Sequence, residues 1–177
     1  MSEHLYILTG APGTGKTAVL RGLQTSIRWV AEPARELLAE HPSIDVRRSW
    51  QQDPDVFVLL LLARSIRKYE DIAVSGSGSV VFDRGIPDCI AYALHLGADQ
   101  APSIAAAALY RYNPNVLITE PWDEIYTTDD ERTMGFEATT QFHRHVVTAY
   151  EQSGYTLVEV PRRPIAQRVA FVEAAVS

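Results

Sequence analysis

Eight residues near the N-terminus combine glycines, a lysine and a hydroxyl in a spacing suited to binding phosphate. They are Gly10, Ala11, Pro12, Gly13, Thr14, Gly15, Lys16 and Thr17. This run matches G-x-x-x-x-G-K-[ST], in which glycines let backbone N–H groups point inward at an anion. Lys16 would reach the terminal phosphates as a point charge, and the Thr17 hydroxyl would hold a Mg²⁺ that bridges them. We therefore predict a nucleotide site that uses Mg²⁺, with ATP as the default nucleotide and GTP left open.

A second chemical feature is the pair Asp83-Arg84, which follows the apolar run Val80-Val81-Phe82. A carboxylate at the carboxyl end of a buried parallel strand points into the crevice where ligands bind. In proteins with this phosphate-binding loop, such a residue helps to hold Mg²⁺. We expect Asp83 to serve the metal and the catalysis. Arg84 would bind phosphate or substrate, or else pair with a nearby acid.

Glu32 and Arg35 form a third candidate pair, at the start of a predicted helix. Their spacing of three residues puts both side chains on one face of that helix. Glu32 could accept the proton of an attacking hydroxyl while Arg35 holds the substrate. The alternative is an exposed ion pair of little energetic value. Glu32 and Asp83 both remain candidates for the catalytic base.

The fourth candidate is a polar segment of about 120–136, in which Tyr126, Asp129 and Arg132 are spaced three apart. A polar loop that carries an arginine suits a kinase lid, because closure excludes water and brings a cation to the transferring phosphoryl group. We expect Arg132 to contact the nucleotide and take part in catalysis, and Asp129 to contact the substrate. The alternative is an ordinary solvated loop.

The rest of the chain alternates strand-like and helix-like pieces, which is typical of a parallel sheet wrapped by helices. Expected strands are 5–8, 27–31, 80–82, 116–119 and 155–160. Expected helices are 18–24, 33–40, 54–69 or beyond, 87–96, 103–110, 137–152 and 165–175. Asp53 and Pro54 suit the N-cap and first turn of the long third helix, which we expect to be largely buried.

Composition limits the possible classes of protein. A chain of 177 residues with 46% hydrophobic residues fits one globular domain, 1–177. The Ser-Gly repeat at 75–79 is predicted to be a connector, because neither half holds enough strands to bury a sheet. A net charge of −6 argues against nucleic-acid binding. The longest apolar run, 56–63, is too short to span a membrane. The lone Cys89 and the lack of a leader favour a cytoplasmic protein.

Several stretches together resemble a known family. They are GAPGTGKT at 10–17, EPAR at 32–35, FDRGIPDCIAY at 82–92, the Tyr126-x-x-Asp129-x-x-Arg132 segment and GYTLVEVP at 154–161. They look like the P-loop ATPases and kinases related to the kinase domain of bacterial nicotinamide riboside kinases, and the resemblance covers nearly the whole chain. It implies an α/β, three-layer P-loop NTPase fold, nucleoside-kinase-like, with a five-stranded parallel sheet in the order 2-3-1-4-5. It also implies an ATP site at the P-loop and an acceptor site bounded by Glu32, Asp83-Arg84 and the lid.

Two functions fit these motifs. The first is an ATP- and Mg-dependent phosphotransferase that moves the γ-phosphoryl group to a hydroxyl of a nucleoside, another metabolite or an antibiotic. The second is a regulatory P-loop ATPase or GTPase that acts through a protein partner. A guanine-type switch would need Asn-Lys-x-Asp after the fourth strand, where this chain has Glu120-Pro121-Trp122-Asp123. It would also need Asp-x-x-Gly after the third, where this chain has Asp83-Arg84-Gly85-Ile86. The sequence therefore favours the kinase.

Overall fold

The described residues form one parallel sheet with helices on both faces. The computed structural model describes residues 3–40, 53–74, 78–122 and 136–177. The strands are β1 (Leu5–Gly10), β2 (Arg28–Val30), β3 (Val80–Asp83), β4 (Asn115–Thr119) and β5 (Thr156–Glu159). They run in the order β2-β3-β1-β4-β5, and every neighbouring pair is parallel. The expected α/β fold and sheet order are confirmed.

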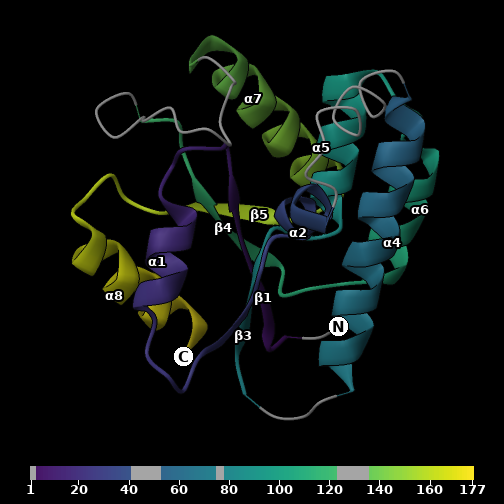
Figure 1. Cartoon of the computed structure of the whole chain (residues 1–177). Helices are drawn as coiled ribbons and strands as arrows, with labels where there is room; N and C mark the ends of the chain where they lie inside the picture. The colour runs from purple at the N-terminus through teal and green to yellow at the C-terminus, as the bar shows by residue number, and fades with distance from the viewer. Residues whose placement is uncertain (1–2, 41–52, 75–77, 123–135) are drawn as a thin grey trace.

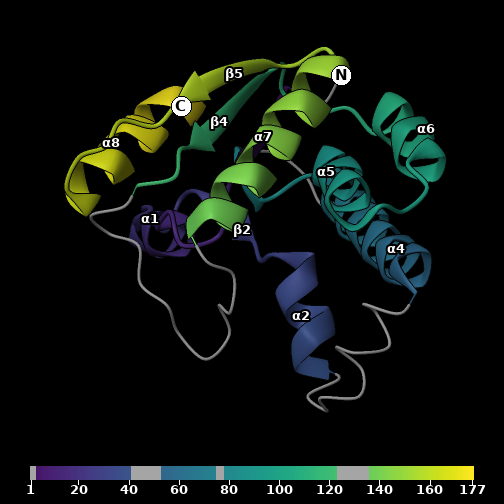
Figure 2. The ribbon, with the colours of Figure 1, turned by 90° about the horizontal axis from the view of Figure 1, so that it is seen from above.

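The helices divide between the two faces of the sheet, as Figure 1 shows. On one face lie α1 (Lys16–Gly22) and α8 (Ile165–Val176). On the other lie α4 (Pro54–Ala73), α5 (Pro87–Leu96), α6 (Ala101–Leu109) and α7 (Phe136–Gln152). A further short helix, α2 (Pro33–Glu40), projects outward between α1 on one side and α4 and α5 on the other (Figure 2). This three-layer arrangement leaves the carboxyl ends of the central strands beside α1 and α2.

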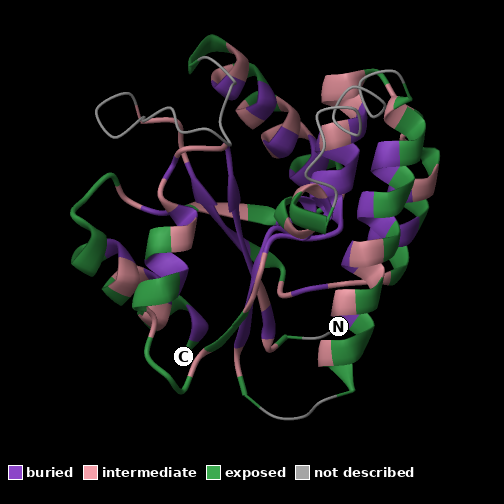
Figure 3. Ribbon diagram, in the orientation of Figure 1, coloured by how far each residue is buried: buried purple, intermediate pink, exposed green. Residues whose placement is uncertain are grey.

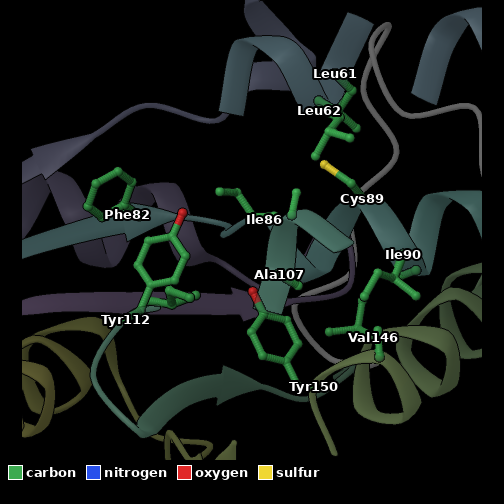
Figure 4. Close-up of a cluster of buried hydrophobic side chains, with 14 of the residues drawn as sticks. Leu61, Leu62, Phe82, Ile86, Cys89, Ile90, Ala107, Tyr112, Val146 and Tyr150 are labelled. Atoms are coloured by element: carbon green, nitrogen blue, oxygen red, sulfur yellow. The ribbon is translucent and has the colours of Figure 1, made fainter. Parts of the chain in front are cut away.

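The core explains why the central strands are apolar on both faces. Successive side chains of a strand point to opposite faces. Ile7 of β1 therefore packs in the core on the α5 and α7 side, whereas the next residue, Leu8, packs with α1 and α8. In β3, Phe82 likewise packs on the α5 and α7 side and Val81 packs with α1 and α8. The purple central strands of Figure 3 show this double burial, and Figure 4 shows the larger cluster, in which Cys89 and Ile86 lie among aromatic and aliphatic side chains.

Local signals fix several helix ends. The Asp53 side chain accepts a hydrogen bond from the Val56 backbone N–H at 3.2 Å, and Pro54 opens α4, as expected. Gly97 ends α5 with a φ of 73°, a left-handed conformation that glycine adopts easily. The other boundaries fall within two residues of the expected ones, and α4 continues beyond Tyr69, to Ala73.

The expectation that the long helix is largely buried was wrong. One face of α4 contributes Phe57, Val58 and Leu61 to the core, but Leu59 and Leu60 on the other side are 49% and 44% exposed. The reason is that α4 is an outer helix of its layer, so its neighbours cover only one side of it (Figure 1). Apolar residues on several faces of a helix therefore did not mean burial on all of them. In the described part of the chain no helix combines the length and apolar character that a membrane span requires.

Candidate functional site

The loop between β1 and α1 is shaped by its glycines. Gly10 has a φ of 130°, and a Cβ there would lie 2.1 Å from the backbone oxygen of Thr119, so no side chain fits. Gly13 and Gly15 have φ values of 78° and 80°, in the left-handed region that glycine tolerates best. The sequence pattern thus dictates a tight turn in which the backbone approaches β4 closely. This is the local geometry expected of a phosphate-binding loop.

Lys16 lies inside this loop with its side chain largely buried. Its Nζ donates to the backbone oxygens of Ala11 at 2.7 Å and Gly10 at 3.1 Å. Burial, together with the positive charge of Arg84, lowers the pKa of Lys16 to about 7. Such an ammonium is poorly solvated, and an anion in the loop would replace the weak carbonyl contacts with a full opposite charge.

A single cavity joins this loop to the other predicted site residues. It has a volume of about 820 Å³. One end is lined by the loop and by cationic side chains of α1 and of the segment after β5, namely Lys16, Arg21, Arg163 and Arg168. The other end is lined by Glu32, Ala34, Arg35, Leu38, Arg84, Tyr92 and Trp122. We call these the nucleotide end and the acceptor end.

The acceptor end is built around Glu32, which binds two arginines. Its Oε1 accepts from Arg84 Nε at 2.7 Å, and its Oε2 accepts from Arg35 Nε at 3.1 Å. The Tyr92 hydroxyl lies 3.4 Å from Oε1. Burial would raise the pKa of Glu32, but the positive charges of Arg84 and Lys16 lower it to about 2. Glu32 is therefore a fixed negative charge in the cavity wall.

Arg84 is held from its other side by Asp88 on α5. Arg84 Nη1 donates to Asp88 Oδ1 at 2.9 Å, and both side chains are 3% exposed. Asp88 also accepts from the Thr9 hydroxyl, the Gly85 backbone N–H and the Tyr150 hydroxyl, at 2.7, 2.9 and 2.5 Å. Arg84 has a φ of 70°, which is unusual for a residue with a side chain. Its orientation is thus fixed by several partners at once.

Asp83 lies at the end of β3 and is 3% exposed. Its Oδ1 is buried and makes no hydrogen bond within the described part of the chain. Burial raises the pKa of Asp83 to about 6, although the nearby Lys16 charge opposes this shift. An ionised carboxylate that has been desolvated and lacks a donor is costly unless a cation neutralises it.

These residues fit a Mg²⁺ ion. The hydroxyl of Thr17 and the unpartnered carboxylate of Asp83 are oxygen ligands, which Mg²⁺ prefers, and Mg²⁺ usually combines one or two carboxylates with substrate phosphates and water. No cluster of three or more His, Cys, Asp or Glu side chains with metal-site geometry occurs among the described residues. This agrees with a metal that depends on the nucleotide for part of its coordination.

Comparison with known proteins now identifies the family. The sequence family described as an AAA domain matches residues 5–168. The chain belongs to this AAA-domain family. Its P-loop and its sheet order make this AAA-domain protein a P-loop NTPase in fold as well as in motif. No curated protein matches the sequence.

Two solved structures share the fold of the AAA-domain protein at low sequence identity. Thymidylate kinase from Candida albicans superposes with a TM-score of 0.61 at 16% identity, over 99% of this chain and 91% of that one. Thymidylate kinase from Ehrlichia chaffeensis gives a TM-score of 0.58 at 15% identity, over 99% of both chains. At this identity the likeness extends to the P-loop kinase fold.

The structure brings most of the predicted residues of the AAA-domain protein to one place. The P-loop from Pro12 to Thr17, Glu32, Arg35 and Arg84 line one cavity, and Asp83 lies within electrostatic reach of Lys16 and Glu32. Of the two interpretations left open for Arg84, pairing with acids is the one observed. Tyr126, Asp129 and Arg132 of the expected lid lie outside the described residues, so their roles stay predictions.

Two residues of the site escaped the sequence interpretation. Arg168 on α8 donates from Nη2 to the Thr14 backbone oxygen at 2.8 Å, and it is 4% exposed. It sits inside an otherwise ordinary amphipathic helix, far from the P-loop in sequence, so no pattern marks it. Asp88 lies within the FDRGIPDCIAY stretch that carries the family resemblance, but the sequence analysis predicted no role for it.

Proposed function

We propose that this protein is an ATP- and Mg-dependent phosphotransferase that moves the γ-phosphoryl group to a hydroxyl of a small molecule. The observation that carries the proposal is that Glu32 and its arginine partners line the same cavity as the P-loop. A regulatory nucleotide hydrolase needs no second enclosed site of this kind. The kinase fold of the structural neighbours supports the same function.

In this mechanism the P-loop backbone and Lys16 would bind the polyphosphate, and Thr17 and Asp83 would hold Mg²⁺. Mg²⁺ supplies neutralisation of the charge that develops on the phosphates. Lys16 adds a second positive charge at the transferring group, in a site that is buried and therefore of low dielectric. Arg132 is proposed to approach the same group from the lid.

We assign to Glu32 the task of orienting the acceptor hydroxyl. A pKa of about 2 keeps Glu32 ionised, so that it accepts a hydrogen bond at every physiological pH, but it makes Glu32 a weak base. Phosphoryl transfer through a loose transition state needs positioning more than proton removal. Asp83, the other candidate base, is proposed to act through the metal instead, because a carboxylate that holds Mg²⁺ stays ionised.

The acceptor is proposed to be nucleoside-like, or another hydroxylated metabolite or antibiotic. The names of the structural neighbours add one further class, nucleoside monophosphates such as thymidylate. Arg35 and Asp129 are proposed to contact the acceptor from α2 and from the lid.

The test is ATP consumption by the purified full chain with Mg²⁺, alone and with a panel of nucleosides, nicotinamide riboside, sugars, hydroxylated antibiotics and nucleoside monophosphates. The proposal expects ADP formation that depends on one acceptor, together with a phosphorylated product of the expected mass. Lys16→Ala is the matched control and should remove the signal. Steady hydrolysis that no acceptor changes would instead favour the regulatory ATPase, and preference for GTP would overturn the choice of nucleotide.

A further inference from the structure

Two carboxylates within the protein balance the positive charge of Arg84. Its Nε donates to Glu32 Oε1 at 2.7 Å and its Nη1 donates to Asp88 Oδ1 at 2.9 Å. The guanidinium also lies over the Phe142 ring, 5.4 Å from its centroid, and the side chain is 3% exposed. A substrate anion would therefore have to share the charge of this arginine with two buried carboxylates.

The two ends of the cavity differ in their balance of charge. At the nucleotide end, Arg21, Arg163 and Arg168 make no ion pair with a described lining residue, and Lys16 lies within electrostatic reach of Glu32 and Asp83. At the acceptor end, Arg35 and Arg84 both bind Glu32, and Arg84 also binds Asp88, so two guanidiniums are matched by two carboxylates. Asp83 adds a further acid behind them. Counted over the described residues, only the nucleotide end carries an excess of positive charge.

A phosphomonoester brings between one and two negative charges at neutral pH. At the acceptor end it would lie against the ionised Glu32 and would find Arg84 already paired. Like charges at close range in a buried site repel strongly, because little water screens them. A neutral or cationic hydroxyl compound meets no such cost, since its O–H can donate to Glu32.

We propose that the acceptor end selects a hydroxyl compound that carries no phosphate group, and that Asp88 enforces this selection by holding Arg84. This inference rests on the proposed function and narrows its substrate class. Asp88 is a positioning residue here, because it contacts Arg84 and not the cavity. Three other donors, from Thr9, Gly85 and Tyr150, hold the Asp88 carboxylate, which in turn holds Arg84.

The experiment compares matched pairs of probes that differ by one phosphate: thymidine with thymidylate, adenosine with adenosine monophosphate, and ribose with ribose 5-phosphate. Binding to the full chain saturated with Mg-ADP is measured by calorimetry, and transfer from Mg-ATP is measured in parallel. The proposal expects each phosphomonoester to bind at least tenfold more weakly than its partner. Equal or tighter binding of the phosphomonoesters would overturn it.

Two variants test whether the charge of Glu32 causes the weaker binding of phosphomonoesters. Glu32→Gln removes the negative charge of the wall and should tighten ribose 5-phosphate binding at least tenfold. Glu36→Gln is the matched control, because Glu36 lies one turn further along α2 and pairs with Lys68 at 2.6 Å, away from the cavity lining. It should leave the preference unchanged. If ribose 5-phosphate binding changed equally in both variants, or changed in neither, the result would contradict the proposal.

Asp88→Asn tests the positioning role through selectivity, which a merely structural contribution would not change. It should shift the preference toward phosphomonoesters in the binding experiment, and a folded Asp88→Asn protein with unchanged preference would refute the role of Asp88. If this variant does not fold, the Glu32→Gln comparison still decides the substrate class. Failure of the proposed kinase function can be told apart from failure of this inference. In the first case no probe of either kind would yield ADP, but the binding preference would still be measurable.

Discussion

The two ends of the cavity achieve charge recognition in different ways. The nucleotide end is built around one continuous stretch, in which glycine conformations and a lysine shape a loop, and arginines from other elements add charge beside it. The acceptor end is made from side chains of α2, the β3–α5 turn and α5, which bind one another before any substrate arrives. Backbone geometry therefore governs the first end and a network of paired side chains governs the second.

This difference has a chemical consequence. A backbone loop with an excess of positive charge can bind the polyphosphate of any nucleotide, so it serves as a general site for the phosphoryl donor. A paired network has little spare charge and instead presents fixed hydrogen-bonding atoms, which suits discrimination among acceptors. Substitutions at either end should therefore have separable effects on nucleotide binding and on acceptor selection.

Lys16→Ala should remove phosphoryl transfer to every acceptor. The ammonium stabilises charge at the transferring group in a buried site, so its loss should lower kcat by about 10² to 10³-fold. Initial rates of ADP formation at saturating Mg-ATP measure the effect. Lys68→Ala is the control, because Lys68 binds Glu36 and the Ala31 backbone oxygen away from the loop and should keep the rate within about twofold.

Glu32→Ala and the milder Glu32→Gln should separate the two ends. ATP binding should stay within about twofold, whereas transfer should fall by about 10²-fold, because the acceptor hydroxyl loses its orienting carboxylate. Calorimetry measures the affinity for ATP, and single-turnover experiments measure the rate of transfer. Normal transfer in both variants would show that Glu32 does not act on the acceptor.

Arg168→Met should weaken the nucleotide end alone. It removes a charge-assisted hydrogen bond to the Thr14 backbone oxygen, and such a bond contributes about 1.5–3 kcal/mol. We expect the KM for ATP to rise about tenfold with a smaller change in kcat. Arg162→Met is the matched control: Arg162 binds Glu120 at the surface, so its loss should change KM by less than about twofold. Equal effects in the two variants would remove Arg168 from the nucleotide end.

Asp83→Asn should stabilise the protein at alkaline pH while it lowers Mg-dependent activity. The pKa of Asp83 is raised to about 6 in the folded chain, above its ordinary value, so the folded state binds this proton more tightly than the unfolded state does. Stability contributed by this group is therefore present at low pH and is lost as the pH rises through 6. The gain from Asp83→Asn should be on the order of 1 kcal/mol at pH 8 and close to zero at pH 4.

Thermal unfolding at a series of pH values without Mg²⁺ measures this prediction. Asp99→Asn is a suitable control, because Asp99 is a surface residue that accepts a backbone hydrogen bond from Ala101, and the same change there measures the effect of an Asp-to-Asn substitution away from the site. A pH-independent effect of Asp83→Asn would mean that its carboxylate is not destabilised by burial.

Much of the fold was predictable from the sequence because its signals are local. Alternation of strand-like and helix-like runs indicated a parallel sheet, and both the strand β3 and the helix α5 were found close to their expected bounds. The burial of α4 was predicted wrongly, since the number of neighbours around a helix depends on the layer it occupies and not on its own pattern. The sheet order came from the family resemblance, because residue patterns do not state which strands become neighbours.

By itself the sequence determined the nucleotide end, because eight consecutive residues contain both the backbone freedom and the charge that a phosphate site needs. It also named Glu32, Arg35, Asp83 and Arg84 as candidates. Only the tertiary structure decided what these residues do together. Arg84 is paired on both sides, Asp83 keeps an oxygen without a donor, and Arg168 reaches the P-loop from a helix more than 150 positions later in the chain. Such contacts depend on how distant elements pack, and for that reason no local pattern records them.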